Sequence, residues 1–514
     1  MDRGKLSEAI IQELGIVFMS ALQEAAPELL TADLDGIERR LQAVSRQVFG
    51  RVLEQIVAVR ATQPGARPPC PACGGLLRLV ERTRRRQVQG LVGDATLQRP
   101  TYVCTCCRAG HAPLDAELGL GPGALSPALA RVACRAGIET SFAAAADVLA
   151  ETLGVSVPPD AVRRVTEGVG AVAEADQQRA IAQAQQGQPH PAGDGVEVLV
   201  VEVDGVQVHL EEAWHEMKVG RVAPLGPAVQ TDPRSGRTVL RLGPSACCAG
   251  LETAETFWYR VYALAGRRGW GPATRVVVVL GDGAEWIWKR AAHFVGGPGI
   301  MVLEIVDIFH AYEHLWTVGR ALFATEAAVA AWVEPLKDAL YEQGASAVLA
   351  ALAALTPQDP AVAEVVQTAQ GYFEDHAARM DYPRFVAQHL PIGSGAIESA
   401  CKSLIEEREK GAGMRWSAAG AQAVASLRAL HRSGAWAAFW AHHPLRQPPY
   451  HQPRPRAVPA ARPAGTGPTP PPPPPCGPTA SPSATVAPLP GTAPRRPAPS
   501  HPWRRLPIGR ARCA

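Results

Sequence analysis

Two short runs of valine and leucine constrain the fold of this chain more than any other feature. Residues 198–203 and 276–280 are almost wholly apolar and rich in valine, which is typical of strands that are buried on both faces of a sheet. Each run leads into an aspartate beside a glycine, Asp204 and Asp282. Because glycine lets the backbone turn, we expect both aspartates at the ends of strands, at one edge of an α/β sheet.

The pattern around these runs indicates one domain over residues 191–442, which we expect to be catalytic. Three strand-like segments are followed by a helix near Thr256 to Ala265, the strand ending at Leu280, a helix from Glu285 to Phe294 and a strand from Ile300 to Val306. This succession is expected of a ribonuclease-H-like α/β core. Residues 311–390 have a mostly helical pattern, which predicts a helical insertion after the last core strand.

A third acidic residue follows that insertion. Glu398 lies in the segment GSGAIESACK, at the start of a helix after a flexible Gly-Ser-Gly loop. Three carboxylates that converge at one edge of a sheet could hold two divalent cations, Mg²⁺ or Mn²⁺, on either side of a phosphodiester. Each acid also has a purely structural interpretation, because aspartate before glycine forms turns and Glu398 could pair with Lys402 one helical turn later.

Residues 61–115 contain cysteines at the spacing of a metal site. Cys70 and Cys73 form the first pair, and Cys104 and Cys107 form the second, with strand-like sequence between them. Four thiolates on two such turns are typical of a zinc ribbon, in which a structural Zn²⁺ replaces a hydrophobic core. Cys106 is a spare thiol that could replace Cys107. The alternative is that the cysteines are merely buried.

Two other segments are predicted to be helical. Residues 1–60 show apolar residues at helical spacing, which predicts a hairpin that packs on a neighbour or pairs two protomers. Within residues 116–190, a helix from Phe142 to Leu153, a glycine-containing turn and a second helix from Asp160 give the outline of a helix-turn-helix. Arg163 and Arg164 on the second helix are candidate DNA contacts, although many helix pairs have this outline without binding DNA.

Composition limits the remaining possibilities. No run of 18 apolar residues occurs, so we expect no membrane span, and the cysteine usage suits a reducing cytoplasm. No acidic residue follows Glu409, which leaves a basic C-terminal part. Residues 443–514 are rich in proline and arginine and are predicted to be disordered. Such a tail suggests contact with nucleic acid, but arginine- and proline-rich coding in a high-GC genome produces the same composition.

Several motifs in order carry a family resemblance. They are GDGAEWIW around Asp282, the segment from Asp307 to His310, GSGAIESACK around Glu398, and KGAGMRWS from Lys410. With the cysteine pairs, residues from about 60 to 440 resemble the DDE transposases of ISKra-type bacterial insertion sequences, which are similar to Mutator-like transposases.

The resemblance implies a DNA transposase that binds the ends of an insertion sequence and catalyses metal-dependent strand cleavage and strand transfer. It implies that Asp204, Asp282 and Glu398 are the catalytic acids, with Mg²⁺ or Mn²⁺ as cofactor. Asp307 and His310 match a motif that supports the site or the DNA. Transposon ends and target DNA would be the partners, a homodimer or larger assembly the active form, and the bacterial nucleoid within the cytoplasm the location.

The residues after Glu398 add candidate DNA contacts. Trp416 could stack on an exposed base, and the basic side chains around it could contact phosphates: Arg408, Lys410 and Arg415. Two alternatives to a transposase remain open. One is a nuclease of the same fold that cleaves without joining, and the other is a transposase-derived DNA-binding protein that has no catalytic activity.

Overall fold

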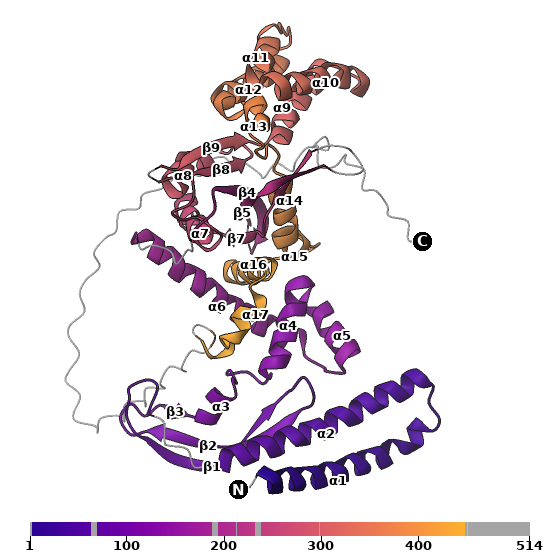
Figure 1. The fold of residues 1–514 in the computed structure, drawn as a ribbon. Coiled ribbons are helices and arrows are strands. Elements are labelled where there is room, and N and C mark those ends of the chain that lie inside the picture. The colour runs from indigo at the N-terminus through magenta and orange to yellow at the C-terminus, as the bar shows by residue number, and fades with distance from the viewer. Residues whose placement is uncertain are drawn as a thin grey trace, which may run out of the picture. The chain divides into compact units, whose positions relative to one another are not determined.

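Two long helices begin the described chain and pack on each other (Figure 1). The computed structural model describes residues 3–62, 69–187, 194–211, 213–231, 238–297, 299–447 and 450. Helices α1 (Arg3–Leu29) and α2 (Leu34–Thr62) meet through small and β-branched side chains, which are Ala21, Ala25, Val44 and Val48. Several large apolar side chains of this hairpin are exposed, among them Ile16 and Phe18.

A small antiparallel sheet follows the hairpin. Its strands, in the order β1-β2-β3, are β1 (Leu77–Val88), β2 (Ala95–Cys104) and β3 (Gly110–His111), and the short helix α3 (Pro113–Glu117) comes next. The loop before β1 carries Cys70 and Cys73, whereas Cys104 ends β2 and Cys107 lies in the turn that follows it. Helix α2 packs against β2, so the hairpin and this sheet are in contact.

The helical module consists of α4 (Pro127–Glu139), α5 (Phe142–Leu153) and α6 (Pro159–Gln185). Ser126 and Ser141 cap the first two helices by accepting backbone amide hydrogens. Gly154 ends α5 in the left-handed conformation, with φ 60°, which glycine adopts without a steric penalty. The helix, turn and second helix expected from the sequence are therefore present.

The larger sheet is mixed, and the described chain contributes six strands to it. The order is β6-β5-β4-β8-β9, with β7 paired to β5; β4 and β5 are antiparallel, whereas β8 is parallel to both β4 and β9. The elements are β4 (Val198–Leu210), β5 (Ala213–Thr231), β6 (Thr238–Leu242), β7 (Ala246–Gly250), α7 (Ala254–Arg267), β8 (Val276–Gly281), α8 (Glu285–Val295) and β9 (Met301–Val306). The fold is therefore mixed α/β, as expected, and β7 is an element that the sequence pattern did not reveal.

Helices cover this sheet and bury the valine-rich strands. Phe257, Trp258 and Val261 of α7 pack with the buried residues of β4 and β8. At the other end of β4, Val206 and Val208 pack against the later helices α14 (Gly395–Cys401) and α16 (Ala418–Arg432). The strands that carry the acidic residues are thus held inside a hydrophobic core.

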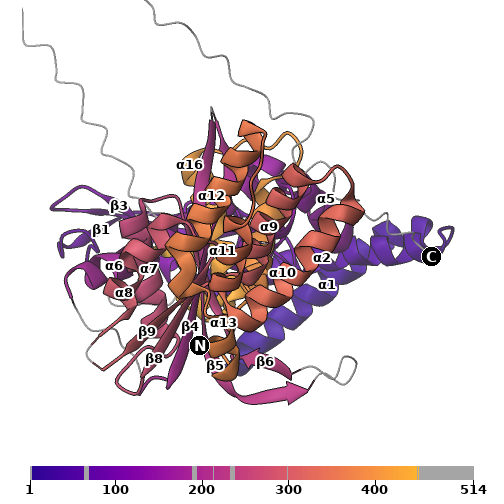
Figure 2. The same cartoon turned by 90° about the horizontal axis from the view of Figure 1, so that it is seen from above.

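A group of helices separates β9 from α14, as the helical pattern of residues 311–390 predicted. Helices α9, α10, α11 and α12 form successive contacts and lie side by side in Figure 2. The elements are α9 (Ile308–Leu322), α10 (Glu326–Gln343), α11 (Ala345–Ala353), α12 (Pro360–His376), the 3₁₀ turn η1 (Ala377–Arg379) and α13 (Tyr382–Ala387).

The last helices complete the core of the helical module, which the sequence-based domain boundaries did not anticipate. After α14 come a π-helical turn (Lys402–Glu406), α15 (Glu407–Glu409), α16, α17 (Trp436–Ala441) and the 3₁₀ turn η3 (Pro444–Arg446). Leu427, Phe439, Trp440 and Leu445 pack with α4, α5 and α6. The folded chain therefore continues to Gln447, past the expected start of disorder at residue 443, and the rest of the predicted tail lies outside the described residues except for Tyr450.

Candidate active site and metal centre

The strand register brings three acidic residues to one level of the larger sheet. Glu202 in β4 pairs with Leu280 in the parallel strand β8, and Gly281 in turn pairs with Val306 in β9. Continuing each pairing along the strands places Asp204, Asp282 and Asp307 side by side. The sequence suggested that Asp204 ends its strand, which is wrong, because β4 continues to Leu210 with β5 as its partner. The edge at which Asp204 lies is formed by the end of β8.

Glu398 joins these acids from α14, which packs on β4 and β5. On the same helix, the Cys401 thiol donates to Asp204 Oδ2 at 3.4 Å. Burial raises the pKa of Asp204, and the negative charges of Asp282 and Glu398 raise it further. The triad is therefore close enough for mutual repulsion. In the described chain, however, its carboxylate oxygens do not all lie within 4.8 Å of one another.

Asp307 is buried and supports the loop before Glu398. Its Oδ1 accepts the amide hydrogens of Phe309 at 3.2 Å and Ser394 at 3.0 Å. Its Oδ2 accepts from the amide of His310 at 3.2 Å and from Ser394 Oγ at 2.8 Å. Ser394 Oγ also lies 3.0 Å from Glu398 Oε1. A hydroxyl has one proton to donate, so only one of the two carboxylates can accept it at a time.

His310 belongs to a cluster of rings beside Asp282. Its ring lies edge-on to His314 and Tyr372, and His314 stacks on Tyr372 with centroids 3.7 Å apart. The Tyr372 hydroxyl donates to the Asp282 carbonyl at 3.4 Å. Burial, followed by the charges of His310 and His376, lowers the pKa of His314 to about 4, so this ring is neutral at neutral pH. Sequence reasoning missed His314 and Tyr372, although the i, i+4 spacing of His310 and His314 was visible.

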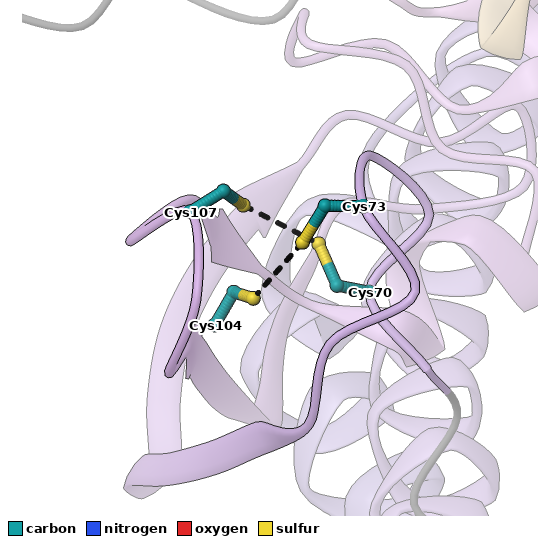
Figure 3. A group of neighbouring side chains, drawn as sticks. All are labelled: Cys70, Cys73, Cys104 and Cys107. Atoms are coloured by element: carbon teal, nitrogen blue, oxygen red, sulfur yellow. Dashed lines mark hydrogen bonds between the residues drawn. The ribbon is translucent and has the colours of Figure 1, made fainter.

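The four predicted cysteines form one compact group (Figure 3). Cys73 Sγ lies 3.5 Å from Cys104 Sγ, and Cys70 Sγ lies 3.6 Å from Cys107 Sγ. All four sulfur atoms lie within 4.8 Å of one another, so they can hold a metal ion such as zinc. A hydrogen bond from the Gly75 amide, together with the neighbouring thiols, lowers the pKa of Cys73 to about 6, which favours the thiolate form that binds metals.

The structure distinguishes Cys107 from Cys106. Cys107 belongs to the group, whereas Cys106 is an exposed free thiol outside it. His111 Nε2 on β3 lies 3.2 Å from Cys70 Sγ, a neighbour that the cysteine spacing could not reveal.

Three of the four exposed DNA-binding candidates already have acidic neighbours. Arg163 pairs with Asp160 and Glu167, and Arg164 pairs with Asp160. Their side chains are 46% and 66% exposed, respectively. The other two exposed candidates are Lys410, which lies 2.8 Å from Glu406 Oε1, and Arg415, which has no ion-pair partner among the described residues.

Arg408 and Trp416 are not on the surface, contrary to their selection as DNA contacts. Arg408 is 2% exposed and donates from Nε to the Gly137 carbonyl at 2.9 Å. Its guanidinium lies 4.5 Å from the Phe142 ring centroid and 4.8 Å from that of Trp416. Trp416 is 6% exposed and donates to the Glu409 carbonyl. Both side chains are part of the interior in this conformation.

None of the described helices is both long enough and apolar enough to span a bilayer. In comparisons with known proteins, neither the family models nor the curated proteins match this sequence.

Proposed function

We propose that the chain is a DNA transposase of a bacterial insertion sequence, with Asp204, Asp282 and Glu398 as its catalytic acids. The proposal depends mainly on the strand register, which places Asp204 beside Asp282. The packing of α14 against β4 brings Glu398 to the same edge of the sheet. Burial and the charges of Asp282 and Glu398 raise the pKa of Asp204, and acidic groups perturbed in this way are found preferentially at functional sites.

The order of elements supports a ribonuclease-H-like core. Strands β4, β5 and β6 with β7 are followed by α7, β8, α8 and β9, and the helical insertion precedes Glu398. This is the succession that the resemblance to DDE transposases implies.

The donor set fits hard divalent cations. Carboxylate oxygens are the ligands that Mg²⁺ and Mn²⁺ prefer, and a cation would relieve the repulsion that raises the pKa of Asp204. Asp204, Asp282 and Glu398 would hold it. Bound cations would supply charge stabilisation to the attacking and leaving oxygens of a phosphodiester. Asp307 fixes the loop that leads to Glu398, and Ser394 Oγ lies within hydrogen-bond distance of both the Asp307 and the Glu398 carboxylates.

The remaining parts would bind the substrate. A structural Zn²⁺ on Cys70, Cys73, Cys104 and Cys107 would hold the ribbon together. We expect the exposed cations to contact the phosphates of the element ends and the target: Arg163, Arg164, Lys410 and Arg415. Because two DNA ends must be joined to one target, a homodimer or larger assembly is expected.

The test is an assay of strand cleavage and strand transfer by the purified full chain. The substrate is linear DNA that carries the sequences flanking the coding region, with a plasmid target and Mg²⁺ or Mn²⁺. Asp282→Ala should lower cleavage about 10³-fold, because the metal site supplies several kcal/mol of transition-state stabilisation. Asp338→Ala, which changes an exposed aspartate on α10, is the matched control and should retain activity.

Other outcomes identify the alternatives. Metal-dependent cleavage without joining would indicate a nuclease. Specific binding of the ends without cleavage by the wild type would leave a DNA-binding protein and contradict the proposed activity.

A further inference from the structure

The helix that carries Glu398 is interrupted about one turn after that residue. Residues 395–401 are α-helical, the turn Lys402–Glu406 is π-helical, and Glu407–Glu409 returns to α-helix. A π turn accommodates one more residue than an α turn and is frequently found at functional sites. The extra residue rotates the helix before the π turn, which includes Glu398, about the helix axis relative to the helix after it.

Arg428 of α16 holds this π turn. Its side chain is 2% exposed. Nε donates to the Leu404 carbonyl at 2.8 Å, and the terminal nitrogens donate to the carbonyls of Ser403 and Ile138. Two of these acceptors are consecutive residues of the π turn, where the α-helical hydrogen-bond pattern is broken. The planar guanidinium therefore satisfies backbone carbonyls that the π turn displaces.

The third acceptor connects the same arginine to the helical module. Ile138 lies in the last turn of α4, and Arg408 donates to the neighbouring Gly137 carbonyl. Cations at a helix C-terminus are favoured by its unpaired carbonyls and its dipole. Two buried guanidinium groups thus join the end of α4 to the helix that carries Glu398.

The C-terminal end of the Glu398 helix is tightly enclosed. Glu409 is 1% exposed, and neither of its carboxylate oxygens has a hydrogen-bond partner in the described structure. Arg408 beside it lies between two aromatic rings. This end cannot rotate without disturbing a packed interior. A change in the π turn would therefore be transmitted to α14, which packs on β4 and β5 and carries the exposed Glu398.

We propose that Arg428 is a positioning residue that stabilises the π turn and thereby directs Glu398 towards Asp204 and Asp282. If the π turn relaxed to α-helix, Glu398 would rotate by about 100°, the angle that one residue occupies in an α-helix. The inference rests on the proposed function, because it assumes that the three acids bind a divalent cation together.

The test is Mn²⁺ binding to the zinc-loaded full chain, followed by electron paramagnetic resonance, with DNA cleavage as a second readout. Arg428→Lys keeps the charge but cannot reach three carbonyls at once. It should weaken Mn²⁺ binding about 10-fold or more, the usual effect of losing a residue that orients a metal ligand. The control is Arg432→Lys, one turn later on α16. Among the described residues, Arg432 forms an ion pair with Glu139. This variant should bind Mn²⁺ as the wild type does.

A second variant is used if circular dichroism shows that Arg428→Lys does not fold. Insertion of one alanine after the exposed Lys402 rotates Glu398 without altering Arg428, and it should also weaken Mn²⁺ binding. Insertion of one alanine after Ala412, in the exposed loop before Trp416, is its control.

The possible results separate the two proposals. A lower melting temperature of Arg428→Lys with an unchanged Mn²⁺ dissociation constant would mean a structural role only, and would overturn this inference alone. Wild type that binds Mn²⁺ no more tightly than Asp282→Ala would overturn the proposed acidic site and this inference with it.

Discussion

Asp204 and Asp307 lie on the same level of the sheet, on either side of Asp282, but their surroundings differ. Asp204 accepts a backbone hydrogen bond from Gly205 and one from a thiol, and it faces two other carboxylates. Asp307 accepts four hydrogen bonds and caps α9. The surroundings of Asp204 disfavour its charged form, whereas those of Asp307 stabilise its side chain. Removal of the two carboxylates should therefore have opposite effects on the stability of the fold.

We predict that Asp204→Asn stabilises the metal-free protein at neutral pH. Because burial and the neighbouring charges raise the pKa of Asp204 in the folded state, ionisation of this group favours unfolding above that pKa. The gain in melting temperature should be largest above the raised pKa and vanish below about pH 4, where the carboxyl is protonated in both states. Thermal melts of both proteins between pH 3 and pH 8 measure this; a gain that grows towards low pH would contradict it.

Asp307→Ala should instead lower the free energy of unfolding by at least about 2 kcal/mol, since it removes a helix cap and charged hydrogen bonds to a buried loop. Urea unfolding at neutral pH is the measurement. The control is Asp338→Ala, which should be within about 0.5 kcal/mol of the wild type, as is usual for exposed positions. Equal effects of Asp307→Ala and Asp338→Ala would show that the four hydrogen bonds of Asp307 contribute little.

At the level of elements, sequence patterns predicted the structural features that depend only on residues close together in the chain. The valine-rich strands and the cysteine pairs are local features, and their positions follow from periodicity and spacing. The burial of Arg408 is not local, because its acceptor Gly137 is 271 residues away. The π turn and β7 depend in the same way on tertiary partners, which include Arg428 for the turn and β5 for the strand.

The cysteine group gives a prediction that separates two adjacent thiols. Cys107→Ser should reduce bound zinc from about one ion per chain to almost none, because a structural site needs four ligands. Cys106→Ser should leave the zinc content unchanged, since this thiol lies outside the group. Elemental analysis of the purified variants measures both. The reverse result would show that Cys106 is the ligand.

The exposed arginines should affect DNA binding through charge. Replacement of Arg164 or Arg415 by alanine should weaken binding of the element ends and reduce the slope of log K against log salt by about 0.9 for each phosphate that the variant no longer neutralises. Fluorescence anisotropy over a range of salt concentrations measures the slope. Arg179→Ala, also exposed on α6 and paired with Asp176, is the control. An unchanged slope for both test variants would exclude these residues from the DNA interface.

For the whole molecule, buried contacts join the helical module to the larger sheet, so we expect the two to unfold together. Buried Arg260 of α7 binds Glu174 of α6 and Glu252. Burial raises the pKa of Glu174, but the hydrogen bonds and charge of Arg260, together with hydrogen bonds from Ser426 and Gln178, lower it overall. Gly170 of α6 lies so close to Ala423 of α16 that a Cβ atom there would be 2.3 Å from the Ala423 carbonyl oxygen. Substitution at this position would therefore disturb both parts.

The metal-binding end of the ribbon has little such support, whereas Val88, Ala95 and Leu97 at the other end of the sheet pack on α2. Its buried core around the metal-binding group consists of Cys70, Leu77 and Cys104, with Tyr102 and Cys107 packed against them, which is too little apolar surface to fold a small unit without metal or disulfides. Loss of the metal should therefore unfold this metal-binding end and leave the helical module and the larger sheet folded.

We predict that a zinc-selective chelator removes one calorimetric transition and leaves the main one within a few degrees of its original temperature. After chelation, binding of the element ends should weaken, whereas Mn²⁺ binding at Asp204, Asp282 and Glu398 should persist, because the ribbon contributes no residue to that site. Calorimetry, anisotropy and Mn²⁺ titration of the same sample measure the three effects, and re-addition of zinc should reverse the first two. Loss of both Mn²⁺ binding and the main transition would show that zinc stabilises the whole chain. The four-cysteine site and the acidic edge of the sheet would then belong to one folding unit.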